Sequence, residues 1–379
     1  MSHSNPPPDF AELRSLLHAR KLDTERFLAL IRAAHQHDPA LYEEVWLPYL
    51  RGFPHHFQGA FAHLSSRAEL ELFARLLPSC QFGYHATDDA SVSQLAPELV
   101  ERIHTYTHHG HVKASLRFLR SPHLVNLVEL TLHGMKTGQL TRLLERDSLA
   151  NLQKVTIQRA LIDESVMHAL LNASFEPSLR AIDFVAVYFA PEQFERFMDS
   201  ALAINLKALG LSQVDLQRRL EILIRSEPLQ YLEHLLLSHN GLVSREFEAL
   251  WEPGFLQALT SLRIVDNDLE DGAIHDMIES QIFEQLQTLD LATNHLTSVG
   301  FQPLVLASVE RKMEQLLTPS NVIGDEAAHF LSELDDFGAL TCIDLTGNPL
   351  SHEALVMLSE IQALTIELSP LIDTMDEAL

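Results

Sequence analysis

Cysteine is nearly absent from this 379-residue chain, which contains only Cys80 and Cys342. Two cysteines so far apart in sequence make neither a disulfide framework nor a cysteine-based zinc site, and such sparse use is typical of a reducing cytosol. No window holds the roughly 18 consecutive apolar residues that a membrane-spanning helix needs. The start, MSHSNPPPDF, lacks the apolar core of a secretory signal. We therefore expect a cytoplasmic protein.

Motifs of common enzyme classes are also missing. The chain has no Gly-x-x-x-x-Gly-Lys-Ser/Thr loop for a phosphate, no Gly-x-Ser-x-Gly nucleophile turn, and no His-Glu-x-x-His or Cys-x-x-Cys metal motif. With 46% hydrophobic and 21% charged residues, the composition is nevertheless that of a folded protein with a large core. These absences predict a protein that is not an enzyme and needs no cofactor or metal.

Basic residues are scarce in the second part of the chain. Residues 1–120 carry 12 Lys+Arg against 13 Asp+Glu, so nearly all of the net charge of −25 falls on the remainder. After Arg263 only Arg311 and Lys312 are basic. A surface this acidic repels phosphate backbones and anionic membranes, so we expect a basic protein partner and neither nucleic acid nor a membrane. The alternative is that the acidic surface only maintains solubility.

The most informative feature of the sequence is a repeat with a period of 27 residues. Five consecutive segments follow the pattern L-x-x-L-x-L-x-x-N-x-L, with starts at Leu232, Leu259, Leu286, Met313 and Leu340. The fourth residue of each segment belongs to a longer series: Leu130, Val155, Ile182, Leu209, Leu235, Leu262, Leu289, Leu316 and Ile343. The series defines nine units, and such regular spacing is the signature of a repeat architecture.

This pattern resembles the leucine-rich repeat, and its period is similar to that of the ribonuclease-inhibitor-like class. The resemblance covers residues 124 to about 370. The family's asparagine is present at Asn240, Asn267, Asn294, Asn321 and Asn348, whereas the first four units carry Met135, Ala160, Val187 and Val214. Those four units therefore lack the side-chain hydrogen bonds that the asparagine makes to neighbouring turns. Thr318 replaces an inward leucine, and we expect weaker packing there.

The residue pattern inside each repeat predicts one strand and one helix. In LQTLDLATN, Leu289 and Leu291 alternate with Asp290, which indicates a short strand with one buried face. In the second half of the last unit, Ser351 is a plausible N-cap ahead of helically spaced apolar residues. Neither element can bury its apolar face alone, so stacking is required. The predicted fold is an α/β solenoid with a parallel sheet on the concave face and helices on the convex face.

The first 120 residues lack the repeat, and we expect an all-α N-terminal cap there. Part of the segment resembles the helical module that precedes the repeats in some bacterial leucine-rich-repeat proteins. The predicted domains are thus residues 1–120, a solenoid over 121–370, and an acidic tail over 371–379. Within the cap, HTYTHHGH places His104, His108, His109 and His111 close together. Without a carboxylate or a metal motif, we interpret this segment as a solvated helix end.

The residues that flank the inward leucines should project from the concave face, because side chains alternate along a strand. The candidate partner-binding residues chosen on this basis are His133, Lys154, Gln158, Arg159, Asp183, His234, Leu236, His239, Arg263, Asp266, Asp290 and Asp344. We expect Asp266, Asp290 and Asp344 to be exposed and to form one acidic field. Leu236 and Val265 are apolar where the surface should be wet, which can mark a contact patch.

We predict a non-enzymatic scaffold that binds a partner protein through the concave face, the N-terminal module or both. Two alternatives remain. Some ribonuclease-inhibitor-like proteins activate small GTPases, and Arg159 is the candidate for a functional arginine in that case. A metal-dependent hydrolase could instead be built on the histidine-rich segment. The identity of the partner and the oligomeric state do not follow from the sequence.

Overall fold

The structure is a computed structural model in which residues 61–64, 81–85, 100–101, 103–109, 119, 121–251 and 256–368 are described. The chain divides into two compact units. Unit 1 is formed by residues up to His133 together with Arg146–Leu152, and unit 2 by Gly134–Glu145 and residues from Gln153 onward. No helix in the described ranges is long and apolar enough to cross a membrane.

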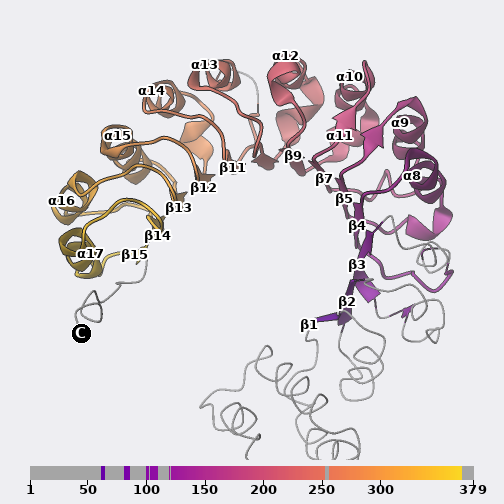
Figure 1. Ribbon diagram of the computed structural model, residues 1–379, viewed down its shortest axis with the longest axis horizontal. Helices are drawn as coiled ribbons and strands as arrows, with labels where there is room; N and C mark the ends of the chain where they lie inside the picture. Colours follow the sequence, from indigo (N-terminus) through magenta and orange to yellow (C-terminus); the bar gives the residue numbers. More distant parts are fainter. Residues whose placement is uncertain are drawn as a thin grey trace, which may run out of the picture. The chain divides into compact units, whose positions relative to one another are not determined.

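Unit 2 contains a parallel sheet in which every strand pairs with the strand of the next repeat (Figure 1). Its strands are β5 (Lys154–Gln158), β7 (Ala181–Val185), β9 (Ala208–Ser212), β10 (His234–Leu236), β11 (Ser261–Arg263), β12 (Thr288–Asp290), β13 (Gln315–Leu317), β14 (Cys342–Asp344) and β15 (Thr365–Glu367). The register runs through the predicted series, since Leu235 lies opposite Leu262 and Leu289 opposite Leu316. The leucine-rich-repeat type of fold predicted from the sequence is therefore confirmed.

Helices line the convex side of unit 2, and the sheet lines its concave side (Figure 1). The helices are α8 (Thr137–Leu144), α9 (Glu164–Leu171), α10 (Gln193–Met198), α11 (Ala201–Asn205), α12 (Leu220–Ile224), α13 (Ser244–Phe247), α14 (Gly272–Ile278), α15 (Ser298–Val309), α16 (Glu326–Ser332) and α17 (His352–Ser359). Ser351 is the N-cap of α17, as predicted, because its hydroxyl accepts from the Ala354 N–H at 3.2 Å. Leu289 and Leu291 are fully buried between the two layers, also as predicted.

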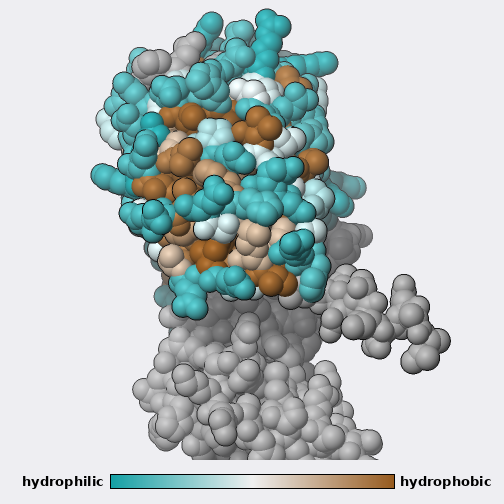
Figure 2. All heavy atoms as spheres, turned by 90° about the vertical axis from the view of Figure 1, so that its left-hand side faces the viewer, coloured by the Kyte–Doolittle hydropathy of each residue, from teal (hydrophilic) through white to brown (hydrophobic). Residues whose placement is uncertain are grey.

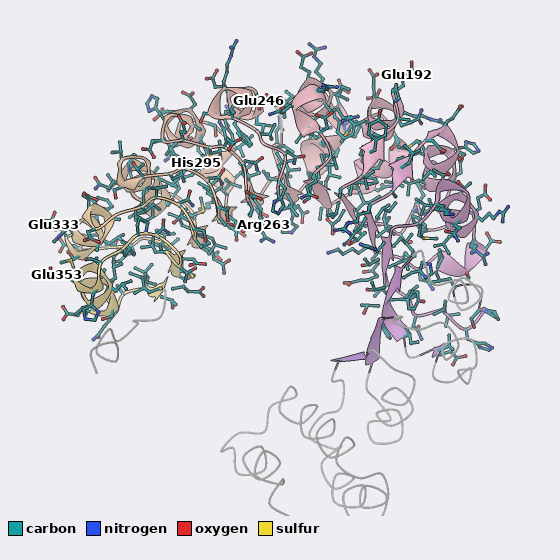
Figure 3. The ribbon with its side chains drawn as sticks, in the orientation of Figure 1. Glu192, Glu246, Arg263, His295, Glu333 and Glu353 are labelled. Carbon is teal, nitrogen blue, oxygen red and sulfur yellow. The ribbon has the colours of Figure 1, made fainter. Side chains whose placement is uncertain are left out.

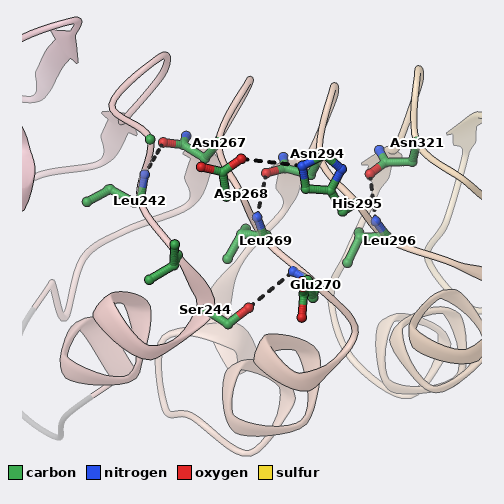
Figure 4. Close-up of polar contacts among 12 residues, drawn as sticks. Leu242, Ser244, Asn267, Asp268, Leu269, Glu270, Asn294, His295, Leu296 and Asn321 are labelled. Carbon is green, nitrogen blue, oxygen red and sulfur yellow. Dashed lines mark hydrogen bonds and ion pairs between the residues drawn. The ribbon is translucent and has the colours of Figure 1, made fainter.

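The five asparagines form a ladder that ties each repeat to its neighbours, and Figure 4 shows three of them, Asn267, Asn294 and Asn321. The side-chain amide of Asn294 donates to the Ile264 carbonyl at 2.8 Å, and its oxygen accepts from the Leu269 N–H at 3.2 Å. Asn267 and Asn321 make the corresponding bonds one repeat before and one repeat after. Because these side chains are buried, each of them satisfies main-chain groups that water cannot reach.

Two of the four repeats without the asparagine solve the same problem with main-chain pairing. Where Ala160 and Val187 replace it, two short strands, β6 (Leu161–Ile162) and β8 (Tyr188–Phe189), pair in parallel. The Tyr188 N–H then donates to the Ala160 carbonyl at 3.0 Å. The replacing residues are buried and apolar. The sequence correctly indicated that these repeats lack the side-chain bonds, and the second sheet supplies what replaces them.

A second ladder, which sequence inspection missed, lies at the starts of the helices. Ser244, Asp271, Ser298 and Asp325 follow one another at steps of 27 residues. Each accepts a hydrogen bond from a main-chain N–H of the next repeat, namely Glu270, Thr297, Gly324 and Ser351 at 3.1, 2.8, 3.0 and 2.7 Å. The Ser244–Glu270 bond is drawn in Figure 4. These bonds join neighbouring helices as the asparagines join neighbouring turns.

The residue before each asparagine position has a left-handed backbone. The series is Gly134, Arg159, Ala186, Gln213, His239, Asp266, Thr293, Ser320 and Gly347, with φ between 49° and 71°. A left-handed conformation costs a residue other than glycine roughly 1–2 kcal/mol. Here it aims the N–H at the next repeat, as in the 2.9 Å bond from Arg159 to the Val185 carbonyl. The sharp turn that ends each strand is thus held by a bond between repeats.

Thr318 and Asp290 correct two predictions about the core. Thr318 is fully buried, but its hydroxyl donates to the Asp344 carbonyl at 3.2 Å, so the polar group that suggested weak packing has a partner. Asp290 was expected to be exposed, whereas only 4% of the residue is accessible. Alternation along the strand assigned the correct face to Asp290, but a neighbouring side chain covers it.

Unit 1 contains strands where helices were expected. Its parallel strands are β1 (Phe61–Leu64), β2 (Gln81–His85), β3 (Ile103–His109) and β4 (Glu129–His133). An all-α cap is therefore wrong for the residues of β1, β2 and β3, whereas β4 belongs to the predicted repeats. Nearly all of the remainder of 1–120 lies outside the described residues. The histidine-rich segment is a strand, in which His108 is buried beside Tyr106 rather than solvated at a helix end. Burial lowers the pKa of His104 below its ordinary value. The predicted tail, 371–379, and His111 are outside the described residues.

Candidate docking surface on the concave sheet

The concave surface of unit 2 is built from two outward positions of each strand. Inward side chains such as Leu235 and Leu237 form the core, and the residues between and after them face the hollow of the arc. Arg263, which projects from β11 into this side, is labelled in Figure 3. Strand spacing of about 4.8 Å makes the nine strands of unit 2 span about 40 Å, which is ample for a protein partner.

A group of partly exposed apolar residues lies on strands β10 to β13 and the turns that follow them. We call this group the concave apolar patch; its members are Leu236, Val265, Ala292, Leu317 and Pro319. Leu236 and Leu317 occupy the same position of the repeat and are three strands apart, with Arg263 and Asp290 on the two strands between them. Val265, Ala292 and Pro319 occupy one position of three successive repeats, so the group differs from the single exposed apolar residues that are ordinary on a protein surface.

An ion pair stands in the centre of this patch. The Arg263 Nε lies 2.9 Å from the Asp290 Oδ2, and the other carboxylate oxygen accepts from the Ala292 N–H at 3.1 Å. The Asp290 side chain is only 5% exposed, while that of Arg263 is 53% exposed. Asp290 is therefore neutralised and partly covered, and the predicted acidic field of Asp266, Asp290 and Asp344 is not formed as expected.

Asp266 is also paired. It lies on the left-handed turn after β11, and its carboxylate forms a hydrogen bond with the ring of His239, which occupies the same position one repeat earlier. His234 is exposed on β10, but it lies at the opposite end of that strand. Asp344 accepts from both the N–H and the hydroxyl of Thr346, at 2.9 and 2.7 Å, so its carboxylate is used to close the turn after β14.

The early strands carry a separate polar cluster. Lys154 Nζ lies 3.3 Å from Asp183 Oδ2, which also accepts from the Thr156 hydroxyl at 3.3 Å. A side chain at Gly210 would clash with the other Asp183 oxygen, so the carboxylate extends over β9 because glycine leaves room for it. Gln158 and Arg159 end β5 beside this cluster, and Arg159 is exposed. His133 belongs to unit 1, at the end of β4.

Cys342 also faces the concave side, on β14, where it is partly exposed. Burial raises the pKa of its thiol, and the nearby carboxylates of Glu367 and Asp344 raise the pKa further. The thiol therefore stays protonated and is a poor nucleophile. Across the described part of the chain, no three His, Cys, Asp or Glu side chains are grouped so that they could hold a metal ion.

Sequence inspection missed Ala292, Pro319 and the central role of the Arg263–Asp290 pair. The signal was available, since Val265, Ala292 and Pro319 follow one another at steps of 27 residues. Comparison of the residues at this position in successive repeats would have identified the apolar series. The partial burial of Asp290 depends on an arginine 27 residues earlier, which only the strand register brings into contact.

Comparison with known proteins finds no matching family model and no match among curated proteins. Solved structures with a similar chain path include an internalin from Listeria monocytogenes, with 15% identity, 89% of this chain and 97% of that chain covered, and a TM-score of 0.39. The Rad7–Elc1 complex in yeast has 14% identity, with 94% of this chain and 93% of that chain covered and a TM-score of 0.46. The TLR13–ssRNA13 complex has 16% identity, with 78% of this chain and 44% of that chain covered and a TM-score of 0.41. All these TM-scores are below 0.5, so the fold assignment rests on this chain's own strands and ladders.

Proposed function

We propose that unit 2 is a non-enzymatic scaffold that binds a partner protein on its concave surface, centred on the concave apolar patch. The observation that carries the proposal is the Arg263–Asp290 pair surrounded by Leu236, Val265, Ala292, Leu317 and Pro319. Protein interfaces commonly combine an apolar centre with a few fixed polar groups, and arginine is enriched in them. The step of 27 residues and the convex helices support the ribonuclease-inhibitor-like class for these repeats.

The paired charges favour a partner that contributes apolar side chains to this surface. Lys154 pairs with Asp183 and Arg263 pairs with Asp290, so the concave sheet has little net charge around these two pairs. A basic partner is therefore not selected by this face. Apolar contact should supply most of the affinity, because it does not depend on uncompensated charge.

Substitutions in the patch test the proposal. The variant Leu236→Glu/Leu317→Glu places two charges in the patch, and Leu161→Glu places one on the β6 strand, away from the concave sheet. Leu161 is 41% exposed, and Leu236 and Leu317 are partly exposed, so both variants should fold. Proteins captured from a lysate of the native host should include one that binds the unaltered chain and Leu161→Glu but not the double variant. Equal capture by all three would overturn the proposal.

Activation of a small GTPase is the second candidate function, and the position of Arg159 favours it. Arg159 is exposed on the turn after β5, where a loop-edge arginine would be accessible to a bound partner. Single-turnover GTP hydrolysis by small GTPases of the host should then accelerate with the unaltered chain and not with Arg159→Ala. No acceleration by either protein would leave docking alone as the function.

A further inference from the structure

The helices on the convex side of the last repeats carry exposed glutamates, and these lie among exposed apolar residues. Helix α15 is apolar on its outer side as well as its inner side: Val299 is 75% exposed and Leu306 is 47% exposed, with Pro303 between them on the same stripe. Val356 on α17 is 40% exposed, and Phe330 on α16 and Met357 on α17 are partly exposed. Figure 2 shows hydrophobic groups among hydrophilic ones on this side.

Comparison along the repeats shows that α15 departs from its neighbours. The position of Leu306 is occupied by Glu279, Glu333 and Glu360 in the adjacent repeats, and that of Val299 by Glu326 and Glu353 in the two that follow. The glutamates at these positions are exposed. An exposed helix position that is charged in the neighbouring repeats has no packing reason to be apolar here.

The result is an apolar centre with an acidic rim, which we call the convex patch. Its centre is formed by Val299, Pro303, Leu306, Phe330, Val356 and Met357, and its rim by Glu279, Glu326, Glu333, Glu353 and Glu360. Glu333 and Glu353 lie on the outer side in Figure 3. Pro303 lies inside α15 and has no N–H, so it cannot donate the helical hydrogen bond to the Val299 carbonyl.

We propose that the convex patch binds a basic amphipathic helix of a partner protein, at a site separate from the concave apolar patch. The apolar stripe of such a helix would cover Val299, Pro303 and Leu306, and its lysine or arginine side chains would reach the glutamates of the rim. Charge argues against other occupants. A second copy would bring an equally acidic face, anionic lipid would be repelled, and residues 1–120 have almost no net charge.

A designed peptide provides the probe. An 18-residue peptide of leucine and lysine, with leucine at helical i, i+3, i+4 and i+7 spacing, is compared with a scrambled peptide of the same composition. Fluorescence anisotropy with the full chain should give binding at least tenfold tighter for the amphipathic peptide. Raising the salt from 50 to 300 mM should weaken that binding severalfold, because the rim glutamates are exposed and screened.

Three variants locate the site. Val299→Gln/Leu306→Gln removes apolar contacts without changing charge and should weaken peptide binding at least tenfold. Glu333→Gln/Glu353→Gln should weaken it severalfold at low salt and reduce its salt dependence. The control is Ile204→Gln on α11, since Ile204 is 48% exposed and matches Leu306 in accessibility. Ile204→Gln should bind the peptide as the unaltered chain does.

Five outcomes would overturn the proposal. Equal binding of the scrambled peptide would mean that charge alone attracts it, and an equal loss in Ile204→Gln would mean that the site is not local. A dimer in sedimentation that Val299→Gln/Leu306→Gln abolishes would make a second copy the occupant, and binding to phosphatidylserine vesicles that this variant abolishes would make it a lipid surface. Hydrogen exchange on the unaltered chain gives a check that needs no variant: the peptide should slow exchange in α15, α16 and α17, and slowing confined to the concave strands would contradict the proposal.

Discussion

Replacement of Asn294 by alanine should destabilise the solenoid more than any surface change, although it removes only one small side chain. Asn294 is 4% exposed. Its amide donates to the Ile264 carbonyl, and its oxygen accepts from the Leu269 N–H. It also donates to Leu291 and Ala292, but those carbonyls keep Asn321 and the Asp266 N–H as partners. The variant Asn294→Ala therefore leaves two buried main-chain groups, at Ile264 and Leu269, without these partners.

The magnitude follows from these two groups. A buried donor or acceptor that loses its partner costs about 1–3 kcal/mol, so Asn294→Ala should lower the free energy of unfolding by about 2–6 kcal/mol. Asn294→Val tests the reason directly. Val187 and Val214 occupy the same position in earlier repeats, but in the Val187 repeat the β6–β8 pairing serves the main chain. Valine at 294 should thus be nearly as damaging as alanine, despite its apolar volume.

Urea unfolding followed by circular dichroism gives the free energy, and hydrogen exchange gives its location. Repeat arrays can unfold in segments, so both measurements are needed. The control is Asn172→Ala, because Asn172 donates to the His168 carbonyl at 2.8 Å but is exposed to water. Its loss should be below about 1 kcal/mol. If Asn294→Ala costs no more than Asn172→Ala, or leaves the Leu269 amide as protected as before, the ladder does not stabilise the repeats as argued.

Two further predictions concern charged groups. Arg263→Leu should lower the free energy of unfolding by about 1.5–3 kcal/mol, because it leaves the nearly buried Asp290 without its partner. The double variant Arg263→Leu/Asp290→Leu should lose less stability than the sum of the two single variants. Additive losses in a double-mutant cycle would show that the pair is not coupled. The hydrogen bonds from Ser351 hold the pKa of Asp325 below the ordinary value of 3.8, so its stabilising effect is complete above that pH and is lost as the pH falls through the lowered pKa. Acid unfolding of Asp325→Asn, compared with the unaltered chain and with Asp336→Asn as an exposed control, should therefore show a smaller stability difference at pH 2 than at pH 6, and an equal difference at both would contradict the role of the Asp325 charge.

The solenoid was predictable because its core depends on residue type at fixed spacing. Leu289 and Leu291 alternate with polar residues, and the asparagines recur every 27 residues, so strands and turns were located correctly. Strand β3 was missed for the opposite reason. It has Tyr106 and His108 at the inward positions where the next strand has leucine, and the paired positions Leu64, Tyr84, Tyr106 and Leu130 are separated by only 20, 22 and 24 residues.

The candidate site was predictable only as a face. Alternation placed Asp183, Leu236, Arg263, Asp290 and Asp344 on the concave side, but it could not say which of them are paired. Contact between Lys154 and Asp183, or between Arg263 and Asp290, arises from strands one repeat apart and from side chains that bend across the sheet. The direction of such bending depends on local space, as Gly210 illustrates beside Asp183.

Each position of the repeat recurs in every repeat, at the same place relative to its strand and helix. Comparison between repeats of this one chain can therefore separate structural from functional residues. Positions that hold the array together keep one chemistry: asparagine in five repeats, or serine and aspartate alternating from Ser244 to Asp325, because each must accept the same main-chain bond. Positions exposed to solvent have no such requirement, and a single departure there needs another cause. Leu306 replaces a glutamate, and Leu236 and Leu317 flank an ion pair at a position that is charged in other repeats. These departures fall on opposite faces of unit 2, one with paired charge and one with unpaired negative charge, so a partner on the concave side and a partner on the convex side should differ in their dependence on salt.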